Sequence, residues 1–281
     1  MADLRELLKK ITRLKAEMDH YRPLTPTQVK MLEKNIRIEH VWTSNAIEGS
    51  HLDRYETASI LDAGVTVNGA SVKDTLAAID LNDAYEYMMD LVAHKQPLSQ
   101  QMIRDLNRIA TLQTANPKSE AGLYRVIDVW PNGLQDHPYV SPFEIRQEMA
   151  KLIRWSRHAQ ATEHPVQYAA DLHQRFVTIH PFVDGNGRTA RLLMNFALTQ
   201  AGYPVINVMP DEASRNTYMV ALEDARNGHR ASFERLIANY VQTELVRRNK
   251  MLALNERNQS DAVNETSPLL QRYLEKHGED Q

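Results

Sequence analysis

The chain has 281 residues, of which 42% are hydrophobic and 25% are charged, a composition typical of an ordinary globular protein. Its formal net charge of −3 provides no overall basic field for nucleic acid or for an anionic membrane. The absence of cysteine excludes disulfides, thiolate metal sites and a cysteine nucleophile. Because no apolar signal segment starts the chain and no apolar run could span a membrane, we expect a cytoplasmic protein.

The first fifty residues predict two helices. Residues from about 3 to 20 repeat apolar side chains at intervals of three and four, which indicates an amphipathic helix. A second helix begins at residues 25–28 (Thr-Pro-Thr-Gln), which form a capping box with proline at the first helical position. This helix can continue to Glu48, where Gly49 is a typical stop. Ser44 and Glu48 share one face of its end, and by themselves indicate only a local hydrogen bond and a solvated carboxylate.

The middle of the chain contains further helical patterns and one stretch of different character. Residues 50–110 read as scaffolding helices, one of them with Ser99 as its N-cap. β-Branched and aromatic residues then gather at 122–130, and a Pro-Asn-Gly turn signal follows at 131–133. With 137–140 as the returning strand, this stretch predicts a small hairpin whose free edge a partner peptide could extend.

The second half of the chain returns to helices. A helical pattern from Pro165 must end at His180, because Pro181 disfavours helix in the residue before it. Residues 192–198 are apolar around most of the helix circumference, which predicts a buried central helix. The sequence becomes polar from about 255 to 266, which predicts a linker to a short terminal segment.

The stretch between these two helices predicts an anion site. Gly185 and Gly187 allow a tight turn whose backbone amides can face a ligand without a Cβ in the way. A helix starts near Arg188, so its free N–H groups and the positive end of its dipole favour a phosphate. Arg188 and Arg191 are three residues apart on this helix and can reach the same anion.

Two further side chains of this stretch are candidates for a metal ligand and for a general base. Asp184 is a hard oxygen ligand beside the turn and suits a Mg²⁺ ion that bridges phosphates. His180 stands at the opposite side as a candidate general base. A zinc site from His173 and His180 is a weaker alternative, because no third ligand stands at a usual spacing.

The residues from His180 to Arg191 resemble the signature of the Fic family, H-x-F-x-D-G-N-G-R-x-x-R, and match every defined position. The resemblance implies an all-α fold, a Fic-type helical bundle with a small β-hairpin flap. It also implies transfer of AMP from ATP to a Ser, Thr or Tyr hydroxyl of a target protein. His180 would be the catalytic base, and Asp184 would hold Mg²⁺ or Mn²⁺.

The resemblance also assigns the nucleotide contacts. The phosphates would be bound by the backbone around Gly185, Asn186 and Gly187 together with Arg188 and Arg191. The segment that follows the central helix is similar to the part of Fic proteins that flanks the adenine of the nucleotide. Tyr218 lies in that segment, either as an adenine-pocket residue or as an ordinary core aromatic.

A second motif is similar to one found with Fic cores. Residues 44–49 match the inhibitory pattern [S/T]-x-x-x-E-[G/N], with Ser44 and Glu48 at its two defined polar positions. The resemblance implies that Glu48 pairs with Arg191 and obstructs the γ-phosphate of ATP, so that the enzyme inhibits itself.

These observations predict that the chain is divided into three parts. Residues 1–97 would be N-terminal helices that include the inhibitory helix at about 26–49, residues 98–245 the catalytic core, and residues 246–281 a helical and polar tail. A target protein would dock on the flap at about 122–140, and self-modification is a further option. We expect no nucleic-acid or membrane partner, and a homodimer remains open.

Three other functions remain open at this stage. The related Doc-type kinases transfer phosphate, but they carry lysine at the position of Gly187. The chain could instead remove AMP, with Glu48 orienting the attacking water. A nucleotide-binding regulator with little turnover is the third alternative.

Overall fold

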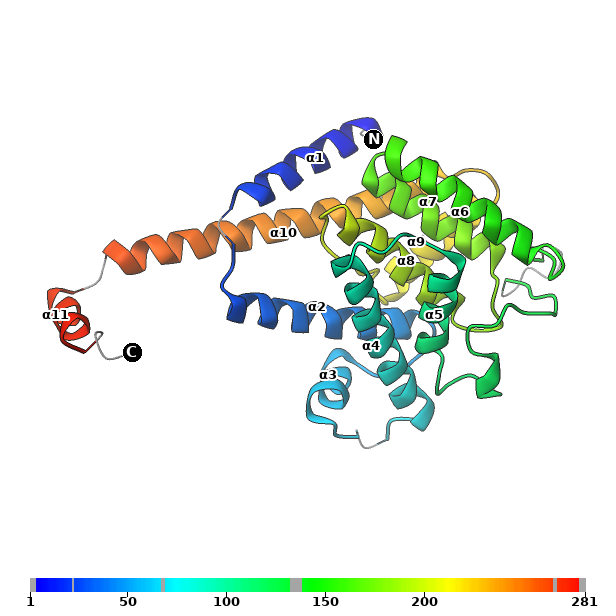
Figure 1. The fold of residues 1–281 in the computed structure, drawn as a ribbon, viewed down its shortest axis with the longest axis horizontal. Helices are drawn as coiled ribbons and strands as arrows, with labels where there is room; N and C mark the ends of the chain where they lie inside the picture. Colours follow the sequence, from blue (N-terminus) through cyan, green and yellow to red (C-terminus); the bar gives the residue numbers. More distant parts are fainter. Residues whose placement is uncertain (1–3, 22, 67–68, 132–137, 265–266, 278–281) are drawn as a thin grey trace.

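The computed structural model describes residues 4–21, 23–66, 69–131, 138–264 and 267–277, and in this part of the chain the regular structure is entirely helical (Figure 1). The helices are α1 (Leu4–His20), α2 (Pro26–Ile47), α3 (Arg54–Ala63), α4 (Val72–Ala93), α5 (Gln100–Ala110), a 3₁₀ turn η1 (Lys118–Glu120), α6 (Ile145–Thr162), α7 (Pro165–Ile179), α8 (Asn186–Gln200), α9 (Glu212–Arg226), α10 (Ala231–Asn264) and α11 (Pro268–His277). Among the described residues, no helix is both long and apolar enough to cross a membrane.

The helix α8 lies at the centre of the bundle, as the apolar run at 192–198 predicts. Every residue from Leu192 to Leu198 is buried. The neighbours α7, α5 and α4 pack around α8, and the end of α2 reaches it from a further side. The N-terminus of α8 is therefore fixed by several elements, which matters for any ligand that binds there.

Several helix boundaries follow the sequence prediction. At the start of α2, the Gln28 amide donates to the Thr25 hydroxyl at 3.3 Å, and the Thr25 amide donates to the Gln28 side chain at 2.9 Å. Ser99 caps α5 by accepting a hydrogen bond from the Met102 amide at 3.1 Å. The helix α7 ends at Ile179, so the boundary predicted before Pro181 is confirmed.

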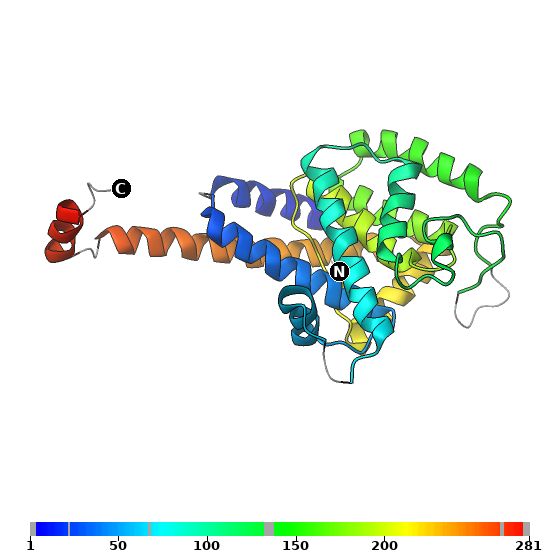
Figure 2. The ribbon, with the colours of Figure 1, turned by 60° about the horizontal axis from the view of Figure 1, so that its bottom comes forward.

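The predicted linker at about 255–266 is wrong for its described residues. The helix α10 continues through this polar stretch to Asn264, because the stretch contains no glycine or proline that would end a helix. Figures 1 and 2 show α10 extending far beyond the bundle, with α11 near its outer end. The helix α1 packs along α10, where the Asn249 side chain donates to the Leu14 carbonyl at 3.0 Å.

The predicted β-hairpin at about 122–140 is not formed by the described residues, and residues 132–137 lie outside them. One backbone hydrogen bond crosses the flap, from the Tyr139 amide to the Val129 carbonyl at 3.1 Å. Other bonds replace the ladder of a hairpin: the Arg125 side chain donates to the carbonyls of Ile127 and Val140. β-Propensity identified an extended segment here, but a single described backbone bond and the Arg125 side chain join its two sides in place of a ladder.

Candidate active site

The turn between α7 and α8 is held in one conformation by its own residues. His180 ends α7 in the left-handed conformation, with φ 51° and ψ 59°. The Asn186 side chain then holds the turn closed, because it accepts from the Phe182 amide at 3.0 Å and donates to the Phe182 carbonyl at 2.8 Å. The side chain of Asn186 thus has a structural role, and only the Asn186 backbone is left to bind an anion.

Gly185 is required by its conformation and by its neighbours. Its φ is +76°, and a Cβ there would lie 2.5 Å from Thr111 Cγ2 and 2.8 Å from Asn107 Nδ2. The turn can therefore pack directly on α5, which brings the first N–H groups of α8 to the surface of the site.

Gly187 lies against the residue that follows α2. A Cβ at Gly187 would lie 2.1 Å from Glu48 Oε1 and 3.2 Å from Arg191 Nη1. The Glu48 carboxylate therefore already occupies the space beside the first turn of α8. An anion is favoured at that place by the free amides and the helix dipole.

Arg191 joins α8 to the end of α2, as the two motifs predict. Its Nε donates to Ser44 Oγ at 2.7 Å, and its Nη2 donates to the Ser44 carbonyl at 2.8 Å and to Glu48 Oε1 at 2.7 Å. The Arg191 side chain is 3% exposed and that of Glu48 is 42% exposed. Burial by itself lowers the pKa of Arg191, but the Glu48 carboxylate and Tyr218 outweigh it and raise the pKa, so Arg191 is a firmly held cation.

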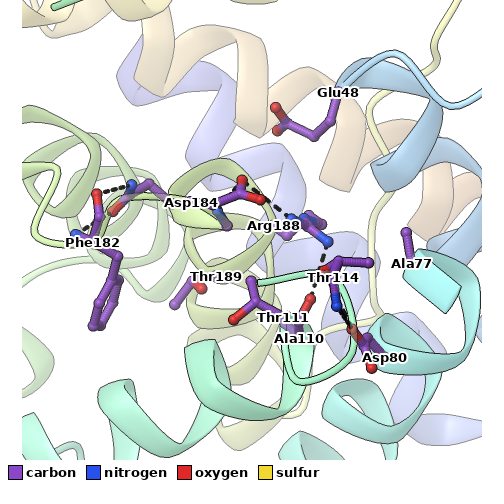
Figure 3. A network of polar contacts seen from close by, with 12 residues as sticks. Glu48, Ala77, Asp80, Ala110, Thr111, Thr114, Phe182, Asp184, Arg188 and Thr189 are labelled. Carbon is purple, nitrogen blue, oxygen red and sulfur yellow. Dashed lines mark hydrogen bonds and ion pairs between the residues drawn. The ribbon is translucent and has the colours of Figure 1, made fainter. Parts of the chain in front are cut away.

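Arg188 takes a different direction from Arg191. Its Nη1 donates to the Ala110 carbonyl at the end of α5 at 3.0 Å, and its Nη2 lies 3.3 Å from Asp184 Oδ1 (Figure 3). The Arg188 side chain is 7% exposed, whereas that of Asp184 is 58% exposed. The Ala110 carbonyl thereby fixes the orientation of the Arg188 side chain, and Asp184 presents its carboxylate to solvent.

The exposed Asp184 carboxylate fits a Mg²⁺ ion that is shared with a ligand. Among the described residues, no group of three His, Cys, Asp or Glu side chains could hold a metal by itself. Mg²⁺ at this site would therefore bind one carboxylate, phosphate oxygens and water, which is how nucleotide-bound Mg²⁺ is usually held. The zinc alternative has no such support, because Nε2 of the buried His173 is hydrogen-bonded to the Tyr218 hydroxyl at 2.8 Å.

His180 lines a cleft of about 480 Å³ together with Glu48, Gly187 and Arg191. Burial lowers the pKa of His180 to about 4. The imidazole is therefore neutral at pH 7 and able to accept a proton.

The flap covers His180 through Tyr139. The two rings are stacked, with centroids 3.9 Å apart and an interplanar angle of 11°. The Arg226 guanidinium lies 4.9 Å from the centre of the Tyr139 ring and donates to the Pro138 carbonyl at 2.8 Å. The sequence did not predict these contacts, because nothing in the local pattern links Tyr139 to His180.

Tyr218 also lines the cleft, but it is only 1% exposed. Its hydroxyl is hydrogen-bonded to His173 in the core, and it interacts with Arg191. Its predicted role in an adenine pocket stays a prediction.

Two buried polar residues of the scaffold were missed at the sequence level. Asn107, 1% exposed, donates to the Asp184 carbonyl at 3.0 Å and to the Thr189 hydroxyl at 3.2 Å. Asp80, 2% exposed, accepts from the backbone amides of residues 113 and 114 at 2.8 and 3.2 Å, just after the α5 end that holds Arg188 (Figure 3). A signal for Asn107 was present, because it occupies a core position of α5 between the apolar residues at 103 and 110.

Residues 97–198 match the sequence profile of the Fic/DOC family. The chain is 34% identical over 219 residues to "Protein adenylyltransferase Fic" of Drosophila yakuba and, equally, of Drosophila melanogaster. These matches cover 77% of the chain but only 43% of each relative, so the chain spans less than half the length of these curated relatives.

Solved structures resemble the chain over most of its length. Fic-1 (residues 134–508) of Caenorhabditis elegans superimposes with a TM-score of 0.81 at 24% identity, over 90% of this chain and 73% of that one. A Fic-domain-containing signalling protein of Bacteroides thetaiotaomicron superimposes with a TM-score of 0.77 at 29% identity, over 87% of this chain and 98% of that one. The first of these shows a shared fold alone, and the second adds sequence similarity across nearly a whole protein.

Proposed function

This chain is a Fic-domain protein, and on that premise we propose that it transfers AMP from ATP to a hydroxyl group of a target protein. One observation carries the proposal: a neutral His180, the first turn of α8 at Gly187 and the cationic Arg191 line the same cleft. A base, an anion site and a positive charge in one cleft are the parts that nucleotidyl transfer requires.

The reaction follows from the positions of these groups. The oxygen of a Ser, Thr or Tyr hydroxyl attacks the α-phosphorus of ATP, and His180 accepts the hydroxyl proton. The new P–O bond forms as the bond to the bridging oxygen of pyrophosphate breaks, so pyrophosphate leaves with that electron pair. The amides at the start of α8, with Arg188 and Arg191, stabilise the negative charge on the phosphates.

Asp184 is the residue that would hold Mg²⁺. The metal, when bound, neutralises phosphate charge and helps pyrophosphate to leave. Arg188 lies 3.3 Å from one carboxylate oxygen of Asp184, and the Asp184 side chain is 58% exposed, so a metal could reach it from solvent.

Glu48 inhibits this reaction in our proposal. Its carboxylate lies beside Gly187 and pairs with Arg191, where a phosphate would otherwise bind. A carboxylate there repels the triphosphate and occupies the arginine. The enzyme is therefore weakly active until Glu48 moves.

A second candidate function is removal of AMP from a modified target. It is favoured by one observation, that Glu48 and His180 line the same cleft. Glu48 would then orient the water that attacks the α-phosphorus. The target docks on the flap in both cases.

The test uses ATP labelled at two positions with purified wild type and Glu48→Gly. Label transferred from the α-phosphate to protein supports AMP transfer, and label from the γ-phosphate indicates a kinase. No transfer from either position by Glu48→Gly refutes the transferase and favours a nucleotide-binding regulator. Release of AMP from a modified protein by wild type, lost in Glu48→Gly, supports the second candidate.

A further inference from the structure

Arg125 is a buried arginine at the base of the flap. It is 3% exposed, although it lies in an irregular segment between η1 and α6. A buried guanidinium must have its N–H groups satisfied, because an unpaired buried donor is costly. Every hydrogen bond that the structure describes for this side chain ends on a backbone carbonyl.

These carbonyls belong to three separate parts of the site. Arg125 Nε donates to the His180 carbonyl at 2.8 Å, Nη1 donates to the Ile127 carbonyl at 2.7 Å, and Nη2 donates to the Val140 carbonyl. In addition, the Arg125 amide donates to the Pro181 carbonyl at 2.9 Å. One side chain thus joins both sides of the flap to the peptide of the proposed base.

The His180 carbonyl needs such a partner. His180 has φ 51°, which is uncommon for a residue with a side chain and persists only where the surroundings hold it. It also ends α7, so its carbonyl lies at the negative end of that helix, where a cation is favourable. Arg125 meets both requirements with one N–H group.

The Val140 contact bears on the ring that covers His180. Tyr139 precedes Val140 and stacks on the imidazole at 3.9 Å. If the Val140 carbonyl were released, the segment that carries Tyr139 would lose an anchor next to the base. The flap, which we propose as the docking site of the target, would then no longer have a fixed position relative to His180.

We propose that Arg125 is a positioning residue that fixes the flap against His180, so that an acceptor hydroxyl docked on the flap meets the base at the correct distance. This inference rests on the proposed function. Arg125 is absent from the lining of the cleft, so its effect is exerted through the flap and the His180 peptide. Its planar guanidinium reaches the three carbonyls from three separate nitrogens, whereas lysine would have to reach all three from one nitrogen.

The test compares Arg125→Lys and Arg125→Met in the Glu48→Gly protein. The control is Arg247→Lys, which removes a guanidinium paired with Glu244 on α10. Three quantities are measured: the rate of AMP transfer, the Kd of Mg²⁺-ATP by calorimetry, and hydrogen exchange of the peptide that contains Tyr139. Circular dichroism melting confirms that each variant is folded.

We expect both Arg125 variants to lose about 10–100-fold in transfer rate, as for a displaced reacting group. Their Kd for Mg²⁺-ATP should stay within about twofold of the parent value, because the phosphate site is built on α8. The Tyr139 peptide should exchange at least about tenfold faster. The control should change none of these quantities.

Four results would overturn the proposal. Parent-like transfer by Arg125→Lys would mean that charge alone suffices. An equal loss of ATP affinity, or a variant that does not fold, would mean that Arg125 supports the whole domain. Unchanged exchange at Tyr139 would mean that the flap is held by other groups. If the Glu48→Gly parent itself transfers nothing, the proposed function fails, and the exchange measurement alone still decides whether Arg125 holds the flap.

Discussion

The Glu48→Gly substitution removes a carboxylate that lies beside Gly187 and pairs with Arg191 at 2.7 Å. A hydrogen bond between charged groups contributes about 1.5–3 kcal/mol. Because the Glu48 side chain is 42% exposed, solvent screening places this pair near the lower end of that range. Each 1.4 kcal/mol corresponds to about tenfold, so freeing Arg191 for phosphate should raise transfer about tenfold.

Two further features of the site affect this magnitude. Removal of the negative charge beside Gly187 also removes its repulsion of the triphosphate, which extends the expected gain to about 10–100-fold. Arg191 keeps its two bonds to Ser44 at 2.7 and 2.8 Å, so it stays oriented after the substitution. The gain is therefore not offset by disorder of the arginine.

The assay follows transfer of label from the α-phosphate of ATP to protein, with the Kd of Mg²⁺-ATP measured in parallel. A matched control is Glu163→Gly, because Glu163 also follows a helix, at the end of α6, and lies outside the cleft. We expect Glu163→Gly to behave as wild type. Equal transfer and equal ATP affinity in wild type and Glu48→Gly would refute the reasoning and leave Glu48 as an ordinary helix-end carboxylate.

Three further predictions concern the base, the metal ligand and the buried histidines. His180→Ala in the Glu48→Gly protein should lower transfer about 10²–10⁴-fold while the Kd of ATP changes little, as single-turnover and calorimetric measurements would reveal. Asp184→Ala should abolish the part of ATP affinity that depends on Mg²⁺, and full activity in excess chelator would contradict this role. Burial lowers the pKa of His40 and His180 to about 4 and that of His173 to about 3, all from 6.5. The unfolded chain therefore binds more protons below pH 6.5, so these groups should make the free energy of unfolding fall between about pH 6.5 and 4, by up to about 1.4 kcal/mol per pH unit for each histidine. Urea unfolding at several pH values measures this slope, and His173→Gln should flatten it, because one of the histidines with a lowered pKa is removed.

The local features of the fold followed from the sequence. The capping box at Thr25, the helix end before Pro181 and the buried run at 192–198 each depend on residues within one or two turns of each other. The anion site at the start of α8 was predictable for the same reason, since glycines, helix start and arginines are adjacent in the chain. Local rules failed at 255–264, where polar composition indicated a linker and the structure continues a helix.

The contacts between distant segments were not predictable in the same way. Asn107 lies 77 residues from Asp184, and Arg125 lies 55 residues from the carbonyl of His180 that it binds. Side chain to backbone bonds of this kind leave no periodic pattern, because any carbonyl is an equivalent acceptor. The pair of Glu48 and Arg191 spans 143 residues and was anticipated only because a motif resemblance connected them.

The end of α2 contacts Arg191 in two ways, and in the proposed inhibition this limits how Arg191 could be released. Glu48 accepts from Arg191 Nη2 and would compete with phosphate for this cation, while Ser44 accepts from Nε and from the same Nη2. Val41 and Ile47 at this end of α2 are buried in the core, so withdrawal of the whole helix would expose apolar surface. It would also remove both Ser44 and Glu48 from Arg191. A movement confined to the Glu48 side chain frees the arginine and keeps it oriented. If Glu48 inhibits as proposed, activation by a local change at residues 48–49, where Gly49 has φ +99°, should therefore be more favourable than displacement of α2.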